Sequence, residues 1–501
     1  MNTLMLLQMA AEAMGDRIAI TNKDKNISFQ ELYNSALAAT KVIIDSNCKY
    51  VSVLDISSFA VPIAMFGAAG AGVPYVPINY RLTEDEIQQL LGRITPALLI
   101  TDTEKATQYA DKDGVLVIER EQFISQMSKA DVSDTEFPMD SDQVAVQLFT
   151  SGTTGRPKAA VLRHNNLVSY ILGSVEFMSA NEDDAAIVTV PPYHVAGISA
   201  LISSVYSGRR MALLPDFSAE AWLELAHREK ITNAFIVPTM LARVIDHLVG
   251  KGIEKVDMPH LKALAYGGGK MPARIIEEAL QLFPNVNFTN AYGLTETSST
   301  ITILGSAEHR EAIASDQPDI RKRLTSVGIP LPTVEIEIRD SDGHITPSNE
   351  PGEIYVRGEQ VSGEYVEKGS TLDDAGWFPT RDTGYLDDAG YLYLEGRADD
   401  VIVRGGENIS PGEIENLLLT RHDLVDAAVV GIPSDQWGEA VAAAIVAKPN
   451  TSVSAKELQD FVRTEMRSSR VPEKIKFVDQ LPYNETGKLL RRVIKVELAD
   501  T

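Results

Sequence analysis

The clearest chemical signal in the chain is a polar segment that follows the apolar run 144–149. Residues 148–158 read LFTSGTTGRPK. Four hydroxyls, two glycines and one lysine come from Thr150, Ser151, Gly152, Thr153, Thr154, Gly155 and Lys158. Glycines let backbone N–H groups approach phosphate oxygens, hydroxyls donate hydrogen bonds, and lysine adds a mobile positive charge. The segment therefore predicts a phosphate-binding loop, although it lacks the GxxxxGK[ST] spacing of a Walker A loop. The alternative is a strand-to-strand turn rich in small polar residues.

A second polar cluster, NAYGLTET at residues 290–297, is expected at the exit of a strand over 286–290. Tyr292 offers a flat face on which a base could stack, and Thr295 offers a hydroxyl. The carboxylate of Glu296 could hold Mg²⁺ against phosphate oxygens. The alternative interpretation is a turn that caps a helix.

Three further clusters follow toward the C-terminus. Asp382 lies in the sequence GWFPTRDTG, where we expect a turn between strands and a carboxylate able to bind two ribose hydroxyls; an Asx turn is the alternative. Arg397 could contact phosphate or ribose, and the pair Gly405–Gly406 gives the backbone freedom. Lys488 lies in ETGKL on a predicted tight turn, where a surface lysine is the alternative.

The elements that must position these clusters alternate between strands and helices. Strands are expected at 51–56 and 97–101, and Ser28 with Glu31 predicts a capping box at the start of a helix. This alternation predicts α/β layers. Short alternating strands over 325–395 indicate a small β unit, and about a hundred residues after Arg397 form a compact α+β module. The glycines of FGAAGAG end a helix, so they indicate close helix packing rather than dinucleotide binding.

Composition excludes several classes of function. The chain has 501 residues, of which 44% are hydrophobic, and a formal net charge of −24 without a basic block, so a nucleic-acid or anionic-membrane partner is not expected. The single cysteine, Cys48, fits a reducing compartment. The N-terminus reads as an amphipathic helix rather than a signal peptide, and no stretch has the apolar length of a membrane span. We therefore expect a cytoplasmic protein without membrane insertion.

Together and in this order, the clusters resemble the adenylate-forming superfamily, which includes acyl-CoA synthetases, peptide-synthetase adenylation domains and firefly-type luciferases. The resemblance covers nearly the whole chain. It implies an α/β fold with a large N-terminal domain of layered sheets and helices, a small β unit and a smaller, mobile α+β lid domain. The implied domains are 1–396 and 401–501, with a hinge at 397–400 centred on Asp399. The implied cofactors are ATP, Mg²⁺ and CoA.

The resemblance also implies the role of each site residue. The ATP- or AMP-binding set is Thr150, Ser151, Gly152, Thr153, Thr154, Gly155, Lys158, Gly267, Gly268, Gly269, Asn290, Ala291, Tyr292, Gly293, Asp382 and Arg397. The catalytic set is Lys488, Thr295, Glu296 and His194, with Glu296 also the metal ligand. The CoA-binding set is Arg404, Gly405, Gly406, Glu407 and Trp437. For His194, which matches a gate beside the acyl site, a core histidine is the alternative.

The implied reaction activates a carboxylic acid as an acyl-adenylate and transfers the acyl group to CoA. The expected acyl pocket, around 193–197, 235–239 and 265–269, is apolar, which favours a medium- or long-chain fatty acid. The alternatives are an aryl or other small acid, an acyl-AMP ligase that loads a carrier protein, and a non-catalytic nucleotide- or acyl-binding protein. A homodimer is a family-level expectation. Ala159, Arg381 and Arg404 depart from the residues common in the superfamily.

Overall fold

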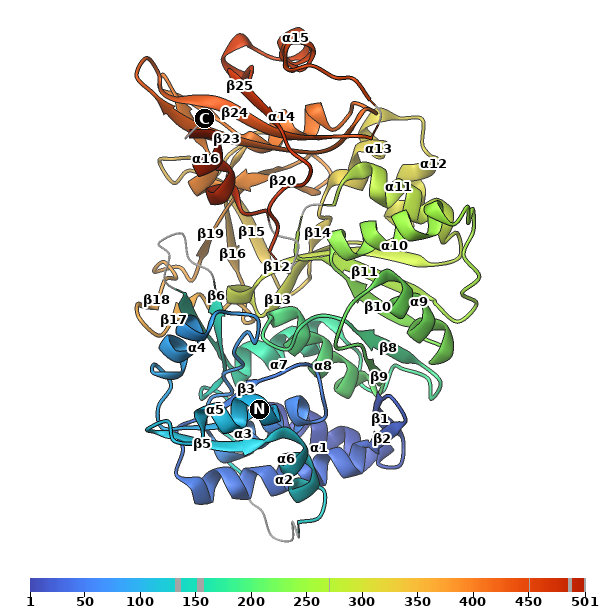
Figure 1. The fold of residues 1–501 in the computed structure, drawn as a ribbon, viewed down its shortest axis with the longest axis vertical. Coiled ribbons are helices and arrows are strands. Elements are labelled where there is room, and N and C mark those ends of the chain that lie inside the picture. Colours follow the sequence, from blue (N-terminus) through green and yellow to red (C-terminus); the bar gives the residue numbers. More distant parts are fainter. Residues whose placement is uncertain (131–136, 151–156, 270, 450, 485–488, 500–501) are drawn as a thin grey trace.

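The chain folds as a mixed α/β protein with a large N-terminal domain and a smaller C-terminal domain, as the sequence predicts (Figure 1). The computed structural model describes residues 1–130, 137–150, 157–269, 271–449, 451–484 and 489–499. The N-terminal helices lie at one end of the long axis and the C-terminal elements at the other (Figure 1).

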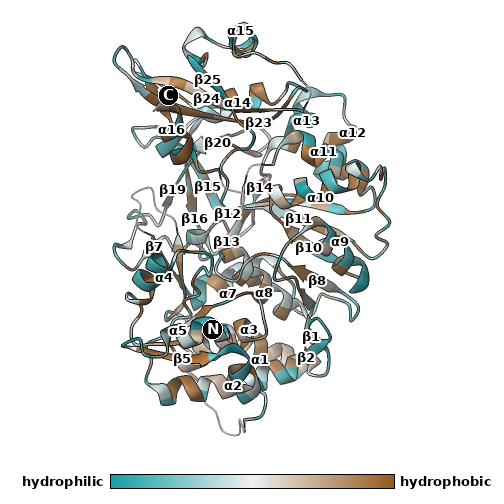
Figure 2. Ribbon diagram, in the orientation of Figure 1, coloured by the Kyte–Doolittle hydropathy of each residue, from teal (hydrophilic) through white to brown (hydrophobic). Residues whose placement is uncertain are grey.

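The centre of the large domain is a sheet with nine strands among the described residues. In spatial order they are β14 (Ile329–Pro330), β13 (Ser299–Leu304), β12 (Asn287–Leu294), β11 (Ala263–Gly267), β10 (Asn233–Ile236), β8 (Ala185–Val188), β9 (Arg210–Leu213), β1 (Ile18–Asn22) and β2 (Lys25–Ser28). The middle strands run parallel, so their carboxyl ends meet at one edge. Trp222, Leu241 and Ile276 pack in one core cluster and come from α9 (Ala219–Arg228), α10 (Pro238–Gly250) and α11 (Ala273–Leu282). In Figure 2 these outer helices show teal interrupted by brown, as amphipathic helices do.

A second sheet carries the phosphate-loop segment. Its strands are β3 (Tyr50–Leu54), β4 (Ala97–Thr101), β5 (Val115–Glu119), β6 (Val144–Thr150), β7 (Lys158–Arg163), β17 (Glu364–Tyr365) and β18 (Gly369–Ser370). Tyr75 joins the two halves of this sheet because it bridges to Val51 on one side and to Val146 on the other.

The remaining helices of the first half pack around these two sheets. They are α1 (Thr3–Met14), α2 (Phe29–Ser46), α3 (Ala60–Ala71), α4 (Glu84–Leu91), α5 (Thr103–Tyr109), α6 (Arg120–Met127), α7 (His164–Ser174) and α8 (Val195–Ser207). The capping box of Ser28 and Glu31 is present at the start of α2, as predicted.

The predicted β unit is a four-stranded sheet among the described residues, and the C-terminal module has its own core. The unit contains β15 (Glu335–Arg339), β16 (Gly352–Arg357), β19 (Phe378–Leu386) and β20 (Leu392–Arg397), preceded by α12 (Ser306–Ala314) and α13 (Pro318–Lys322). The module contains β21 (Ile402–Arg404), β22 (Glu407–Ile409), β23 (Leu424–Ser434), β24 (Gly438–Ala447), β25 (Lys474–Phe477), α14 (Pro411–Leu418), α15 (Ala455–Glu465) and α16 (Arg491–Ala499). Ile414, Val429 and Val462 belong to one buried cluster of this module. No helix in the described part of the chain is both long enough and apolar enough to cross a bilayer.

The glycines of FGAAGAG pack helix against helix, as predicted. A Cβ atom on Gly67 would lie 2.6 Å from the Cβ of Ala39, and one on Gly70 would lie 2.1 Å from Oγ1 of Thr40. Both neighbours belong to α2, so the glycines of α3 allow the two helix backbones to approach closely.

We predict that Gly70→Ala lowers the free energy of unfolding by about 1–3 kcal/mol, because the added methyl overpacks the α2–α3 contact. Gly250→Ala is the matched control, since a Cβ there meets nothing within 4 Å and the residue also ends a helix. Urea-induced unfolding of both variants measures the difference. Equal stabilities of the two variants would contradict the packing argument.

Candidate active site

The carboxylate of Asp382 links two segments that the sequence places far apart. Asp382 in β19 faces Arg397 in β20 as a register partner, and Nη1 of Arg397 donates to Oδ1 of Asp382 at 2.8 Å. The hydroxyl of Tyr292 in β12 donates to Oδ2 at 2.5 Å. Asp382 is buried, and burial followed by the Asp382 charge raises the pKa of Tyr292 well above its usual value, so the phenol stays a neutral donor.

Two local predictions around this link are wrong. Asp382 lies inside β19 rather than in a turn, and residues 290–294 continue β12 instead of leaving it. Cross-strand pairing of β12 with β13 and of β19 with β20 keeps both segments extended. The charged groups therefore stand on sheet backbone, which fixes them more firmly than loops would.

Arg381 stands where the superfamily commonly has glycine, and its backbone shows why the difference matters. Its φ is +63°, in the left-handed region that favours glycine. Its side chain is largely exposed, with Nε 3.8 Å from a carboxylate oxygen of Glu353. An exposed ion pair of this kind contributes little, so the arginine occupies a strained position without an offsetting contact of comparable size.

The carboxylate of Glu296 lies beside the end of the phosphate-loop segment. Glu296 is in the 3-10 turn Thr295–Thr297, directly after β12. Its Oε1 accepts a hydrogen bond from the hydroxyl of Tyr365 at 2.5 Å, and Nζ of Lys158 lies 5.8 Å from the centroid of the Tyr365 ring. Burial lowers the pKa of Arg397, but the charges of Asp382 and Glu296 outweigh burial and raise it overall. Arg397 therefore feels the charges of both carboxylates.

The glycines that the sequence assigns to the nucleotide and acyl region lie where neighbouring strands approach closely. Gly267 ends β11 beside Ala291 of β12, and a Cβ on Gly267 would lie 2.1 Å from the carbonyl oxygen of Ala291. Gly268 has φ +83° and, like Gly269, is exposed. A Cβ on Gly293 would lie 1.8 Å from the carbonyl oxygen of Ser299. Side chains larger than hydrogen would therefore force these strands apart.

Asn290 supports the same strand from within. Its Nδ2 donates to the carbonyl oxygen of Ser326 at 3.1 Å, and its side chain is buried. The side chain of this predicted nucleotide-binding residue is therefore hydrogen-bonded to a backbone carbonyl of the protein.

His194 immediately precedes α8. Its Nε2 is buried and has no hydrogen-bond partner among the described residues, and its ring lies 4.6 Å from the ring of Tyr193. Burial, helped by the charge of Arg81, lowers the pKa of His194 to about 4. At neutral pH the side chain is therefore an uncharged imidazole at the start of a helix that borders the expected acyl region.

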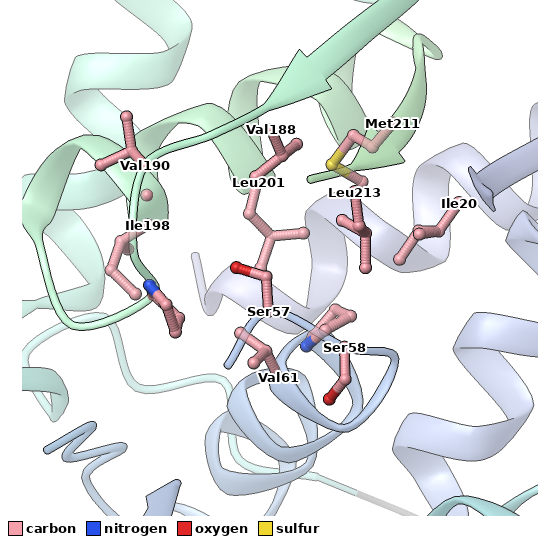
Figure 3. A pocket seen from close by; sticks show the side chains of 13 residues that line it. Ile20, Ser57, Ser58, Val61, Val188, Val190, Ile198, Leu201, Met211 and Leu213 are labelled. Atoms are coloured by element: carbon pink, nitrogen blue, oxygen red, sulfur yellow. The ribbon is translucent and has the colours of Figure 1, made fainter. Parts of the chain in front are cut away.

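An apolar cavity of about 30 Å³ lies behind the same helix (Figure 3). Its side-chain lining includes Val188, Val190, Ile198, Leu201, Met211 and Leu213, which Figure 3 shows grouped around it. Gly197, from the stretch expected to form the acyl pocket, also borders the cavity, as does the neighbouring Pro192. The space accepts one or two water-sized groups.

The predicted CoA-binding residues form a hairpin in the C-terminal module. Arg404 pairs with Glu407 across a turn in which Gly405 and Gly406 have φ of 58° and 86°. The Arg404 guanidinium lies 5.4 Å from the ring of Trp437, donates to the carbonyl oxygen of Ser469 and pairs with Glu473. The Trp437 side chain is 41% exposed, so it leaves an aromatic face available to a ligand.

Several predicted residues lie outside the described part of the chain. These are Ser151, Gly152, Thr153, Thr154, Gly155 and Lys488. The residues flanking the loop, Thr150 and Lys158, are register partners at the ends of β6 and β7. Before Lys488, Tyr483 and Asn484 border a cavity of about 570 Å³. Residues of the large N-terminal domain line the same cavity, namely Arg81, Phe217, Thr239, Met240 and Arg243. Tyr483 and Asn484 therefore face the large domain.

Asp399 lies in the 3-10 turn Ala398–Asp400, between β20 and β21. Its neighbour Asp400 lies 3.2 Å, carboxylate oxygen to Nε, from Arg491 of α16. The turn therefore links the small β unit of the core to the C-terminal helix.

Tyr365 is the site residue that sequence reasoning missed. It contacts Glu296, which lies 69 residues away in sequence, and Lys158, which lies still further away. A lone tyrosine in the sequence SGEYVEK carries no local signal of that contact.

The comparisons with known proteins bear on this site as a whole. The pattern of the AMP-binding enzyme family matches residues 7–366, and that of the AMP-binding enzyme C-terminal domain matches residues 413–488. The chain belongs to the AMP-binding enzyme family. The adenylate-forming resemblance, drawn from the motifs, is thereby confirmed.

Two relatives by sequence differ in the acyl acceptor that their names give. A fatty acid–[acyl-carrier-protein] ligase, ScoC of Streptomyces coeruleorubidus, is 30% identical over 444 residues, covering 86% of this chain and 83% of that protein. A 2-succinylbenzoate–CoA ligase of Geobacillus sp. is 29% identical over 489 residues, covering 96% and 94%.

Solved structures match the whole length of this AMP-binding enzyme. The o-succinylbenzoate CoA synthetase MenE of Bacillus subtilis, in complex with the acyl-adenylate OSB-AMP, has a TM-score of 0.82 at 29% identity, covering 98% of this chain and 97% of that one. ATP-bound MatB of Rhodopseudomonas palustris has a TM-score of 0.88 at 25% identity, covering 100% and 99%.

We predict that Arg381→Gly is more stable than Arg381→Ala by about 0.5–1 kcal/mol. Both substitutions remove the guanidinium, but only glycine relieves the left-handed backbone. Chemical denaturation of the pair gives the difference. If the alanine variant is equally stable, the backbone at this position carries no strain.

We predict that His194 makes this enzyme sensitive to mild acid. As the pH falls from 7 to 5, the unfolded chain protonates this histidine near its ordinary pKa of 6.5, whereas the folded chain resists until about 4. The free energy of unfolding should therefore fall by about 1–2 kcal/mol more in the wild type than in His194→Gln over this range. His260 is exposed, so the free energy of unfolding of His260→Gln should fall by the same amount as that of the wild type. Parallel losses in wild type and His194→Gln would contradict the lowered pKa.

Proposed function

We propose that this protein is an ATP-dependent, AMP-forming ligase that joins a carboxylic acid to the thiol of CoA through an acyl-adenylate. The observation that carries the proposal is the set of charged residues in which Asp382 pairs with Arg397, Arg397 also feels the charge of Glu296, and Tyr365 contacts both Glu296 and Lys158. The full-length similarity to ATP-bound and acyl-adenylate-bound synthetases supports it.

In the first half-reaction, a carboxylate oxygen of the acid attacks the α-phosphorus of ATP, and pyrophosphate leaves. Lys158 and the hydroxyls of residues 150–154 are proposed to hold the β- and γ-phosphates. In Asp382, Oδ1 accepts a hydrogen bond from Arg397 and Oδ2 accepts one from Tyr292. Each carboxylate oxygen can accept a further hydrogen bond, so Asp382 is proposed to bind a ribose hydroxyl as well. Such a displacement asks the protein mainly for positioning and charge stabilisation.

A divalent cation fits the site. The Glu296 carboxylate is a hard oxygen ligand beside the hydroxyl-bearing Thr295, which is the donor chemistry that Mg²⁺ prefers. Glu296 would hold the ion, whose positive charge would offset that of the phosphate oxygens. Lys488 is proposed to stabilise the charge that develops between carboxylate and α-phosphate.

The second half-reaction needs a different part of the C-terminal module. We propose domains 1–396 and 401–501 that rotate about a hinge at 397–400, centred on Asp399. Tyr483 and Asn484 face the core in this structure, which fits the arrangement in which Lys488 serves adenylation. Rotation would bring the hairpin of Arg404, Gly405, Gly406 and Glu407, with Trp437, to the acyl-adenylate, where the CoA thiol displaces AMP.

The acid is proposed to bind between His194 and the glycines at the end of β11. An uncharged imidazole with a free ring nitrogen can orient one oxygen of the acid without holding it as an ion pair. The neighbouring apolar cavity is small, so it extends the pocket by a methyl-sized group and does not itself accommodate an extended chain. Aryl acids, as named for the succinylbenzoate relatives, and fatty acids, as named for the carrier-protein ligase, are both candidate substrates.

A second candidate function, an acyl-AMP ligase that loads a carrier protein, is favoured by one observation. A relative of 30% identity over 86% of this chain is named as such a ligase. The two functions share the first half-reaction and differ only in the thiol that accepts the acyl group.

The deciding experiment incubates the protein with ATP, Mg²⁺ and a panel of fatty, aryl and dicarboxylic acids, each with and without CoA. We expect AMP release that needs both an acid and CoA, together with an acyl-CoA of matching mass. Acid-dependent pyrophosphate exchange with a thioester only on a holo-carrier protein would establish the second function. No acid-dependent AMP or pyrophosphate release across the panel would overturn both.

We predict that Lys488→Ala lowers the rate of acid-dependent pyrophosphate exchange at least about a hundredfold, because the developing charge loses its cation. Thioester formation from a supplied acyl-AMP should stay within about twofold of wild type. Lys456→Ala, at an exposed lysine of α15 in the same module, should leave both half-reactions unchanged. Equal loss of both half-reactions in Lys488→Ala would contradict this division of roles.

A further inference from the structure

A short segment that follows the small β unit's second strand holds the Glu296 turn from two sides. The carbonyl oxygen of Glu296 accepts hydrogen bonds from the backbone N–H of Ser362 at 2.8 Å and of Gly363 at 3.2 Å. Two residues further on, Tyr365 donates its hydroxyl to the Glu296 side chain. Backbone and carboxylate of the same residue are therefore fixed by one strand, β17, and the residues before it.

The same strand fixes the phosphate-loop segment. β17 pairs antiparallel with β7, with Glu364 opposite Val161 and Tyr365 opposite Ala160. Glu364 also forms a two-point ion pair with Arg163 at the far end of β7, at 2.8 and 2.9 Å. The ring of Tyr365 consequently lies beneath Nζ of Lys158, within the range of a cation–π contact.

The hydrogen bond divides the two oxygens of the Glu296 carboxylate. Tyr365 donates to Oε1 at 2.5 Å, whereas Oε2 has no hydrogen-bond donor among the described residues. A carboxylate held in this way offers a cation one oxygen, which suits the octahedral shell of Mg²⁺ and disfavours the two-oxygen grip that Ca²⁺ accepts.

We propose that Tyr365 is a positioning residue that fixes Glu296 for one-oxygen binding of the nucleotide's divalent cation and holds Lys158 at the phosphate loop. The inference rests on the proposed function, because it takes Glu296 as the cation ligand. It adds a residue outside the clusters that the sequence analysis singled out. The choice of cation would then depend on a tyrosine that itself contacts neither the metal nor the substrate.

Tyr365→Phe tests the proposal because it removes one hydroxyl and keeps the ring beside Lys158. Tyr109→Phe is the matched control, since the Tyr109 hydroxyl also donates to a glutamate, Glu84, at 2.8 Å, but on α5 and α4 and not to a proposed ligand of the cation. Mn²⁺ serves as the probe cation, with its binding followed by electron paramagnetic resonance in the presence of a non-hydrolysable ATP analogue. No turnover is needed for this readout.

We expect the apparent Kd for Mn²⁺ to rise about tenfold in Tyr365→Phe, as befits the loss of a hydrogen bond to a charged group. Binding of the analogue without divalent cation should stay within about twofold of wild type. The ratio of Ca²⁺- to Mg²⁺-supported pyrophosphate exchange should increase. Tyr109→Phe should match wild type in every readout.

Three results would overturn the proposal. Wild-type Mn²⁺ affinity in Tyr365→Phe would show that the hydroxyl does not position Glu296. Equal losses of analogue binding with and without the cation would show a merely structural role. If the wild-type protein itself binds no Mn²⁺–nucleotide, the proposed function fails first and the inference with it, whereas normal wild-type binding with an unaffected variant removes the inference alone.

Discussion

The structure depends on how one buried carboxylate is compensated. Asp382 is buried, and a buried carboxylate without partners would be strongly unfavourable. Arg397 and Tyr292 supply those partners from two other strands, so the central sheet, the small β unit and the turn that leads to the C-terminal module meet at a single residue. A change in this link would therefore be felt both in the nucleotide region and at the start of the proposed hinge.

Charge explains why the site needs help from a cation. The chain carries a formal net charge of −24, so ATP must be met by local positive groups. The positive charge of Arg397 is partly offset by the negative charge of Asp382. Lys158 supplies a second positive charge, beside the ring of Tyr365, whose hydroxyl donates a hydrogen bond to Glu296. Two positive groups facing a triphosphate leave most of its charge uncompensated, which is the physical reason that a divalent ion fits here. β17 then matters because it holds the proposed metal ligand and the phosphate lysine in one frame.

Much of the fold could be predicted from the sequence because its signals are local. The capping box of Ser28 and Glu31, the alternation of strands and helices, and the packing role of Gly70 all follow from neighbours within a few residues or from glycine itself. Asp382 was wrongly expected in a turn because its extended state is imposed by pairing with β20. The contact of Tyr365 with Glu296 depends on sheet order, which no local pattern encodes. The roles of the site residues remain predictions, and those at 151–155 and 488 lie outside the described residues.

The most direct test of the acyl-adenylate route follows one oxygen atom. The acid is supplied with ¹⁸O in both carboxylate positions, together with ATP, Mg²⁺ and CoA, and the products are analysed by mass spectrometry. If the carboxylate attacks the α-phosphorus and the thiol then attacks the acyl carbon, one ¹⁸O stays on AMP and the other in the thioester. The acyl-adenylate route therefore predicts AMP that carries one ¹⁸O atom. ADP in place of AMP, with ¹⁸O in inorganic phosphate, would contradict it, because the acid would then have been activated at the terminal phosphate as an acyl phosphate.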